Sequence, residues 1–191
     1  MRFFTPTLIT LAISMAAINP ATAGTYAVDP AHTNAMFEAS HYGTSTNRGR
    51  FGKVEGTVQF DRQARTGAVN VSIDMLGLST GTAAFDKHLQ SPDFFNVAVH
   101  PSVKFSGDKL GFNGDKVAEI SGVLTMLGKT HPVTLKASQF NCYTNPMLKR
   151  EVCGGDFEAT IDRTQWGMDY GVNYGITKSV RIVIQIEAIA Q

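Results

Sequence analysis

Apolar and polar residues alternate along most of this chain, and the alternation constrains its fold more than any other feature. The even-numbered residues of 54–60 and the odd-numbered residues of 69–75 are apolar or glycine, and the residues between them are polar. A period of two residues is typical of a β-strand with one buried face. Further alternating runs occupy residues 33–42, 118–126, 133–140, 156–162 and 178–190. We therefore predict about eight or nine antiparallel strands.

Two short segments separate these strands. Asn113-Gly114 is the dipeptide typical of a two-residue β-hairpin turn. In residues 82–89 the period changes, because Phe85 and Leu89 lie four positions apart on one helical face, and Ser91-Pro92 ends the helix. A single short helix among many strands does not fit an alternating α/β fold. Strands with one apolar face each can bury those faces in a closed barrel or in a sandwich, and spacing alone does not choose between them.

The first residues predict export. Arg2 precedes an apolar run at residues 8–18, and Ala21-Thr22-Ala23 has the small-x-small form of a signal peptidase site. We expect residues 1–23 to be a signal peptide cleaved after Ala23, and residues 24–191 to form one periplasmic domain. The apolar run is shorter than the 20 or so residues that a membrane span needs. No stable membrane insertion is expected.

The charge of the mature chain argues against nucleic-acid binding. The whole chain has 17 Lys and Arg against 16 Asp and Glu, so loss of Arg2 leaves 16 of each and a net charge of zero. A neutral chain has no overall electrostatic attraction to nucleic acid or to an anionic membrane. The sequence does not decide between a monomer and a homodimer.

Cys142 and Cys153 are the two cysteines of the chain. In an exported protein an isolated pair indicates a disulfide. The ten residues between them are mostly polar and include Pro146, so we expect a surface loop that the bond staples. A redox-active pair is the alternative, but the spacing is far from Cys-x-x-Cys.

Several segments resemble, in order, the YceI-like family of exported polyisoprenoid-binding proteins. They are residues 26–33, 37–43, 50–51, Gly56, and residues 88–97, 101–105, 122–126 and 162–168. The resemblance implies an all-β fold, an eight-stranded antiparallel barrel of lipocalin type with one or two short helices, which encloses an apolar pocket for a prenyl chain. Such a barrel is just wide enough to be filled by side chains or to hold one ligand. Leu127, where relatives often carry arginine, and Trp166, where phenylalanine is commoner, depart from the family pattern.

The alternation and the resemblance together predict which residues contact the ligand. Small residues expected to face inward, Ala35, Ala39 and Gly56, would leave space for it. We expect no cofactor apart from a bound isoprenoid lipid. The apolar candidates are Phe37, Val58, Val71, Ile73, Phe85, Leu89, Phe94, Phe95, Phe105, Leu124, Leu135, Ile161, Trp166, Met168, Ile182 and Ile184. The candidates for binding a polar or diphosphate head are His32, Arg50, His88 and Arg163.

Ser79 raises the alternative of an enzyme acting on a lipid or quinone. Gly77-Leu78-Ser79-Thr80-Gly81 fits G-x-S-x-G between a strand and the helix. A nucleophile elbow also needs repeated βαβ units and a histidine late in the chain, whereas the last histidine is His131. A strand-to-helix turn is the simpler interpretation, and we predict that the protein is not an enzyme.

Other polar clusters have simpler explanations. No two of the five histidines stand four residues apart, so no zinc spacing is present and no metal is predicted. Asp156, Glu158 and Asp162 share one strand face, where carboxylates usually serve solvation. A further alternative is a stress-response module whose barrel is packed solid and which binds proteins through its surface.

Overall fold

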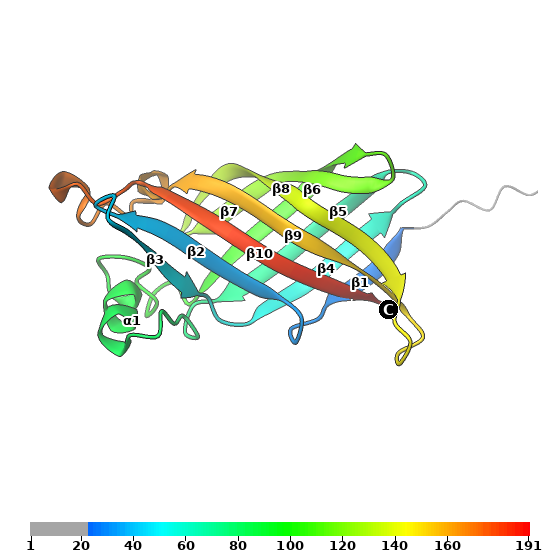
Figure 1. Cartoon of the computed structure of the whole chain (residues 1–191), viewed down its shortest axis with the longest axis horizontal. Coiled ribbons are helices and arrows are strands. Elements are labelled where there is room, and N and C mark those ends of the chain that lie inside the picture. The colour runs from blue at the N-terminus through cyan, green and yellow to red at the C-terminus, as the bar shows by residue number, and fades with distance from the viewer. Residues whose placement is uncertain (1–22) are drawn as a thin grey trace, which may run out of the picture.

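The computed structural model describes residues 23–191 as an elongated β-barrel (Figure 1). The predicted signal peptide lies outside these residues, except for Ala23. In the described part of the chain, no helix has the length and apolar character to cross a membrane. The strands are β1 (Gly24–Val28), β2 (Asn34–His41), β3 (Ser45–Arg50), β4 (Val54–Asp61), β5 (Thr66–Asp74), β6 (Ser102–Asn113), β7 (Lys116–Met126), β8 (Lys129–Thr144), β9 (Glu151–Asp162) and β10 (Ser179–Ala190). The helices are α1 (Ala83–Gln90) and two 3-10 helices, η1 (Arg163–Trp166) and η2 (Val172–Tyr174).

The sheet closes on itself with eight strands around the barrel. Their order is β1-β4-β5-β6-β7-β8-β9-β10, and β10 pairs back onto β1. β10 pairs with β1 through residues 188–190 and with β2 through residues 180–185, so β2 continues the wall where β1 ends. β3 then pairs with the outer edge of β2. The prediction of an eight-stranded antiparallel barrel is therefore confirmed.

Two β-bulges change which residues face inward on the hairpin of β6 and β7. The register shifts between Gly107 and Lys109 and again between Gly111 and Phe112. At the second shift Phe112 pairs with Val117, so Ala118 is the extra residue of the bulge. Val117 is buried in place of Ala118, which simple alternation had placed on the inner face. A bulge adds one residue to a strand, so the side chains beyond it that would face outward face inward instead. The sequence contains no pattern that predicts this bulge.

Gly56 is small for a different reason from the one predicted. A side chain there would place its Cβ 2.1 Å from the backbone oxygen of Asn70 on the neighbouring strand. The residue also has a φ of +153°, which L-residues rarely adopt. Glycine at this position therefore allows β4 and β5 to approach and does not provide room for a ligand.

The two ends of the barrel differ. α1 covers one end together with the segment 163–178, which carries η1 and η2, whereas the β8–β9 hairpin projects from the opposite end, near the C-terminus (Figure 1). Thr82 precedes the helix and Ser91 ends it, as the sequence predicts. Asp162 caps η1 by accepting hydrogen bonds from the backbone and hydroxyl of Thr164.

The cysteines lie on paired strands. β8 runs to Thr144 and β9 starts at Glu151, so the predicted ten-residue loop is in fact a six-residue turn at 145–150. Cys142 faces Cys153 directly across the strands, and their sulfurs are joined by a disulfide.

We expect thiol labelling of the denatured, unreduced protein to find no free sulfhydryl group. Replacing both cysteines by alanine should lower the free energy of unfolding by about 2–3 kcal/mol, the value that chain entropy gives for a loop of this length. The thermal midpoints of the two proteins provide the measurement. Two labelled thiols in the wild-type protein would contradict the disulfide.

Tyr26 closes part of the barrel wall beside this hairpin. It is buried, and its hydroxyl donates a hydrogen bond of 2.7 Å to the carboxylate of Glu151. Burial, and then this hydrogen bond, raise the pKa of Tyr26 to about 12. The folded state therefore retains the phenol proton to higher pH than the unfolded state, whose tyrosines titrate near pH 10.

The stabilisation from Tyr26 should thus be complete below about pH 10 and lost as the pH rises to about 12. An ultraviolet titration of the folded protein should show a phenolate component near pH 12 that the Tyr26→Phe variant lacks. A variant with an unchanged titration curve would show that Tyr26 is not the perturbed group.

Candidate ligand cavity and end chamber

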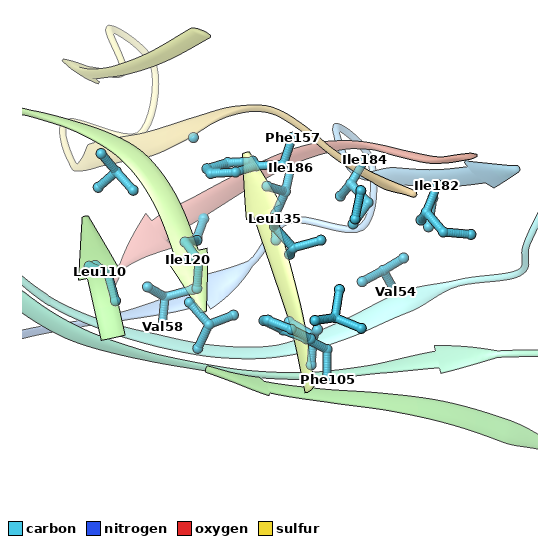
Figure 2. Close-up of a pocket in the computed structure, with 18 of the residues that line it drawn as sticks. Val54, Val58, Phe105, Leu110, Ile120, Leu135, Phe157, Ile182, Ile184 and Ile186 are labelled. Carbon is cyan, nitrogen blue, oxygen red and sulfur yellow. The ribbon is translucent and has the colours of Figure 1, made fainter. Parts of the chain in front are cut away.

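The interior of the barrel contains an apolar cavity, which we call the barrel cavity. Side chains from all eight barrel strands and from β2 point into it, and Figure 2 shows ten of them labelled. No described residue in its lining is charged. The space open to the centre of a water molecule is about 110 Å³, so the cavity is narrow. The lining residues are Tyr26, Ala35, Val54, Val58, Phe60, Val69, Val71, Ile73, Phe105, Leu110, Val117, Ile120, Leu124, Val133, Leu135, Phe140, Cys153, Gly154, Phe157, Ala159, Ile161, Ile182, Ile184, Ile186 and Ala188.

Most of the predicted apolar candidates on strands line this cavity. They come from β4, β5, β6, β7, β8, β9 and β10, because alternation of one apolar and one polar residue sends every second side chain inward. Whether they bind a ligand is a prediction that geometry alone does not test. The nine are Val58, Val71, Ile73, Phe105, Leu124, Leu135, Ile161, Ile182 and Ile184.

A second hollow, the end chamber, lies between α1 and the segment 163–178. It offers about 240 Å³ to the centre of a water molecule. Its lining mixes aromatic, polar and cationic groups, and no described residue in it is acidic. The lining residues are Phe37, Ala39, Ser40, His41, Asn47, Phe51, Phe85, His88, Leu89, Phe94, Phe95, Arg163, Met168, Tyr170, Ile176, Thr177 and Val180. The structure thus brings eight more predicted residues together here: Phe37, Phe85, His88, Leu89, Phe94, Phe95, Arg163 and Met168.

The end chamber lies directly beyond one end of the barrel cavity. On β2 the lining passes from Ala35 in the barrel cavity to Phe37 in the end chamber. On β10 it passes in the same way from Ile182 to Val180. Inward residues two positions apart are neighbours on the same strand face. The ring of Phe37 packs 5.5 Å from that of Phe51 at this boundary.

Arg163 is the buried cation of the end chamber. Its side chain donates hydrogen bonds to the backbone oxygens of Met168, Tyr170 and Thr177, at 2.5, 2.8 and 2.9 Å. A guanidinium has five N–H donors, so two remain beyond these three bonds. Within residues 23–191 no carboxylate lies within ion-pair distance of it. Burial lowers the pKa of Arg163.

Three rings connect α1 to the 163–178 segment and close the outer side of the chamber. His88 on α1 makes edge contacts with Phe94 and with Tyr170, at centroid distances of 5.0 and 4.9 Å. Phe94 and Tyr170 are themselves 5.2 Å apart. The Nε2 atom of His88 also lies 3.2 Å from the carboxylate of Asp93. These contacts make α1 a lid held by aromatic packing.

Two of the predicted head-group residues lie elsewhere. His32 is exposed on the β1–β2 connection, where its Nδ1 lies 2.7 Å from the carboxylate of Asp29, and this hydrogen bond raises the pKa of His32. The side chain of Arg50 is exposed, and its backbone forms an isolated bridge with Ser79. Neither residue lines the barrel cavity or the end chamber.

Trp166 also lies outside both linings. It is 1% exposed, its indole N–H donates to the backbone oxygen of Leu124 at 3.1 Å, and its ring packs 5.0 Å from that of His131. It supports the wall from behind Leu124 and Met168, with which it shares a hydrophobic cluster.

Ser79 lies in the connection from β5 to α1, residues 75–82, but not on a sharp turn directly before the helix. It forms an extended bridge with Arg50, and α1 starts four residues later. Its hydroxyl pairs with the carboxylate of Asp86 and accepts from the amide of Gly81. No histidine is among its hydrogen-bond partners in the described residues. The strand-to-helix turn therefore explains this motif better than a nucleophile elbow does.

The potential metal ligands and the strand-face carboxylates both have structural roles. One set of potential metal ligands is present in residues 23–191, formed by Cys142, Glu151 and Cys153, but the sulfurs are bonded to each other. Glu158, one of the strand-face carboxylates, forms an ion pair with Arg181, which also contacts Glu38 on β2. These carboxylates belong to an outer ladder of charges and lie away from both hollows.

Some lining residues could not be selected from the sequence. Leu110, Val117 and Phe140 line the barrel cavity, yet the bulges in β6, β7 and β8 hid their parity. Phe157 also lines the cavity, on the same strand face as Ile161. Tyr170 joins the end chamber from a segment with no periodic pattern. The aromatic character of Phe140, Phe157 and Tyr170 was the signal available.

A closed antiparallel barrel with an apolar interior and a lidded end defines the class of small barrels that enclose one ligand or a core of side chains. Within that class, the chain belongs to the YceI-like domain family, whose model matches residues 26–188. A UPF0312 protein of Pseudomonas paraeruginosa is 33% identical over 192 residues, which cover 97% of this chain and 98% of the relative. A UPF0312 protein of Shewanella denitrificans is 31% identical over 176 residues, with 88% and 89% covered.

Solved structures share the fold at lower identity. BcnA of Burkholderia cenocepacia is 21% identical with a TM-score of 0.67, covering 86% of this chain and 99% of its own. A polyisoprenoid binding domain from Saccharophagus degradans, implicated in plant cell wall breakdown, is 13% identical with a TM-score of 0.64, covering 90% and 100%. At this level of identity, the two similarities show that the fold is shared.

Proposed function

We propose that this protein is a periplasmic carrier that holds the tail of a long-chain polyisoprenoid in the barrel cavity. The observation that carries the proposal is the lining of this cavity, which every barrel strand contributes to and which includes no charged side chain in the described residues. Burial there stabilises an apolar chain by about 25 cal/mol per Å², and no hydrogen bond is needed. The family membership and the polyisoprenoid-binding domain of the same fold support this ligand class.

The shape of the barrel cavity favours an extended chain over a compact ring. Along β10 the lining runs from Ile182 to Ala188, and six steps of about 3.3 Å give a path of about 20 Å. The path is long compared with its narrow cross-section. A linear prenyl tail matches these proportions.

The end chamber suits the polar head of the same molecule. Arg163 has donors to spare, His88 lies on the opposite wall, and no acidic residue of the described chain lines the space. Such a site favours a head that accepts hydrogen bonds, such as the carbonyls of a quinone or the oxygens of a prenyl diphosphate.

One observation favours the alternative of a solid barrel that acts through its surface. About 110 Å³ is small beside the 300–1,000 Å³ of typical ligand pockets. At about 24 cal/mol per Å³, however, an unfilled space of this size corresponds to about 3 kcal/mol of lost stability, which a ligand would recover.

Extraction of the native protein separates these functions. We expect organic extraction of protein purified from the periplasm without detergent, followed by mass spectrometry, to yield a prenyl lipid in near-stoichiometric amount. Delipidation should lower the thermal midpoint, and adding the lipid back should restore it. A protein that carries no lipid and whose midpoint does not respond to added prenyl lipid would support the surface-acting module instead.

A further inference from the structure

The turn between β8 and β9 exposes large apolar side chains beside cations. Met147 is 89% exposed and Leu148 is 51% exposed, at the tip of a hairpin that projects from the end opposite α1 (Figure 1). Lys149 and Arg150 follow directly and are also exposed. Isolated exposed apolar residues are ordinary, but two adjacent ones on a projecting tip, flanked by two cations, form a compact amphipathic surface.

Hydrogen bonds and a disulfide define the conformation of the tip. The side chain of Asn145 accepts hydrogen bonds from the backbone N–H groups of Met147 and Leu148, at 2.9 and 3.0 Å. Backbone bonds of 2.8 Å join Asn145 to Lys149 and to Arg150. The disulfide between paired residues of β8 and β9 closes the base of the hairpin. These contacts hold the backbone of the turn with the side chains of Met147 and Leu148 exposed to solvent.

An arginine on the neighbouring turn offsets the charge of the acid that follows the hairpin tip. Arg62 on the β4–β5 turn lies 3.2 Å from the carboxylate of Glu151, the acid that follows the hairpin tip. Arg62 thereby balances the charge of that carboxylate, which therefore does not offset the positive charges of Lys149 and Arg150. Because the mature chain has a net charge of zero, attraction to an anionic surface has to come from a local group of cations, and Lys149 and Arg150 form one.

We propose that residues 145–150 are a docking loop for the surface of an anionic phospholipid bilayer. Met147 and Leu148 enter the boundary between head groups and acyl chains, and Lys149 and Arg150 contact lipid phosphates. Two exposed apolar side chains followed by two cations match the acyl-chain boundary and the anionic head groups of such a bilayer. Because Cys153 at the base of the hairpin lines the barrel cavity, docking places that end of the cavity against the membrane. The inference does not depend on a lipid inside the barrel.

Sedimentation with vesicles tests the docking loop. The mature protein should sediment with vesicles of phosphatidylglycerol and phosphatidylcholine more than with vesicles of phosphatidylcholine alone, and salt should weaken the binding. A Met147→Ser, Leu148→Ser double variant should bind about a hundredfold more weakly. A Lys149→Ser, Arg150→Ser variant should lose about thirtyfold, from about 1 kcal/mol for each cation. The matched control, Leu76→Ser with Val99→Ser, removes two exposed apolar side chains at the other end and should bind as the wild type does.

A fluorescence reporter identifies the surface that touches the membrane. Trp166 is the one tryptophan of the chain and is buried, so its emission should not respond to vesicles, and the change in emission of a Leu148→Trp variant reports on the tip. Its emission should shift to shorter wavelength with anionic vesicles. The proposal is overturned if the protein does not sediment with anionic vesicles, if the tip variants bind as the wild type does, or if the Leu148→Trp emission does not move.

Discussion

Replacing Val71 by tryptophan should remove the lipid from the barrel without unfolding it. Val71 lines the barrel cavity on β5, where its partners across the strands are Gly56 on β4 and Phe105 on β6. An indole at this position would occupy the space proposed for the prenyl tail. We expect the amount of lipid recovered by extraction to fall about tenfold or more, while the thermal midpoint of the delipidated protein changes by only a few degrees. Ile73→Trp, two residues along the same inner face, should have the same effect.

Ser72→Trp is the matched control for this experiment. Ser72 stands between the two cavity residues and points to the outside of the barrel, where it lines a shallow groove with Glu55, Asn70 and Lys104. The same ring is thus added to the same strand on its outer face. Its lipid content should stay at the wild-type level. In a barrel already filled by side chains, Val71→Trp would overpack the core at a cost of about 1–3 kcal/mol. A large loss of stability in a protein that never carried lipid would therefore contradict the carrier.

Most barrel strands could be predicted from the sequence, because the apolar positions of the alternating pattern are the positions that the barrel buries. On β10 the even-numbered residues from Val180 to Ala188 are apolar, and the structure places them all inside. The long apolar face leaves the strand a single favourable register. The family resemblance then supplied the closure into a barrel, which strand spacing alone could not distinguish from a sandwich.

The predictions of inward-facing residues failed where local backbone geometry departs from regular alternation. The bulge at Ala118 exchanged the inward roles of two neighbours, and the close approach of β4 and β5 explains Gly56. Among the head-group candidates, His88 and Arg163 came from segments that fold over the barrel end, whereas His32 and Arg50 did not. All four are polar residues in family motifs, so their residue type was enough to make them candidates. Which of them line the end chamber depends on the path of the folded chain.

Removal of the Arg163 side chain should release the segment that closes the end chamber. Arg163 is 4% exposed and holds three backbone oxygens of this segment, so Arg163→Met would leave those oxygens without their charged donor. Three such bonds, at a net 1–1.5 kcal/mol each, suggest a loss of about 3–5 kcal/mol in the free energy of unfolding.

The effect of Arg163→Met should be local as well as large. Hydrogen exchange should accelerate in residues 164–178, while the amides of β9 and β10 stay protected. Arg163→Lys keeps the charge but has one nitrogen in place of the planar fork, so it cannot donate to all three oxygens and should restore little stability. The control Arg50→Met removes an exposed arginine and should change stability by less than about 0.5 kcal/mol. If Arg163→Met left both the stability and the exchange of residues 164–178 unchanged, the buried guanidinium would not be what holds this end of the barrel closed.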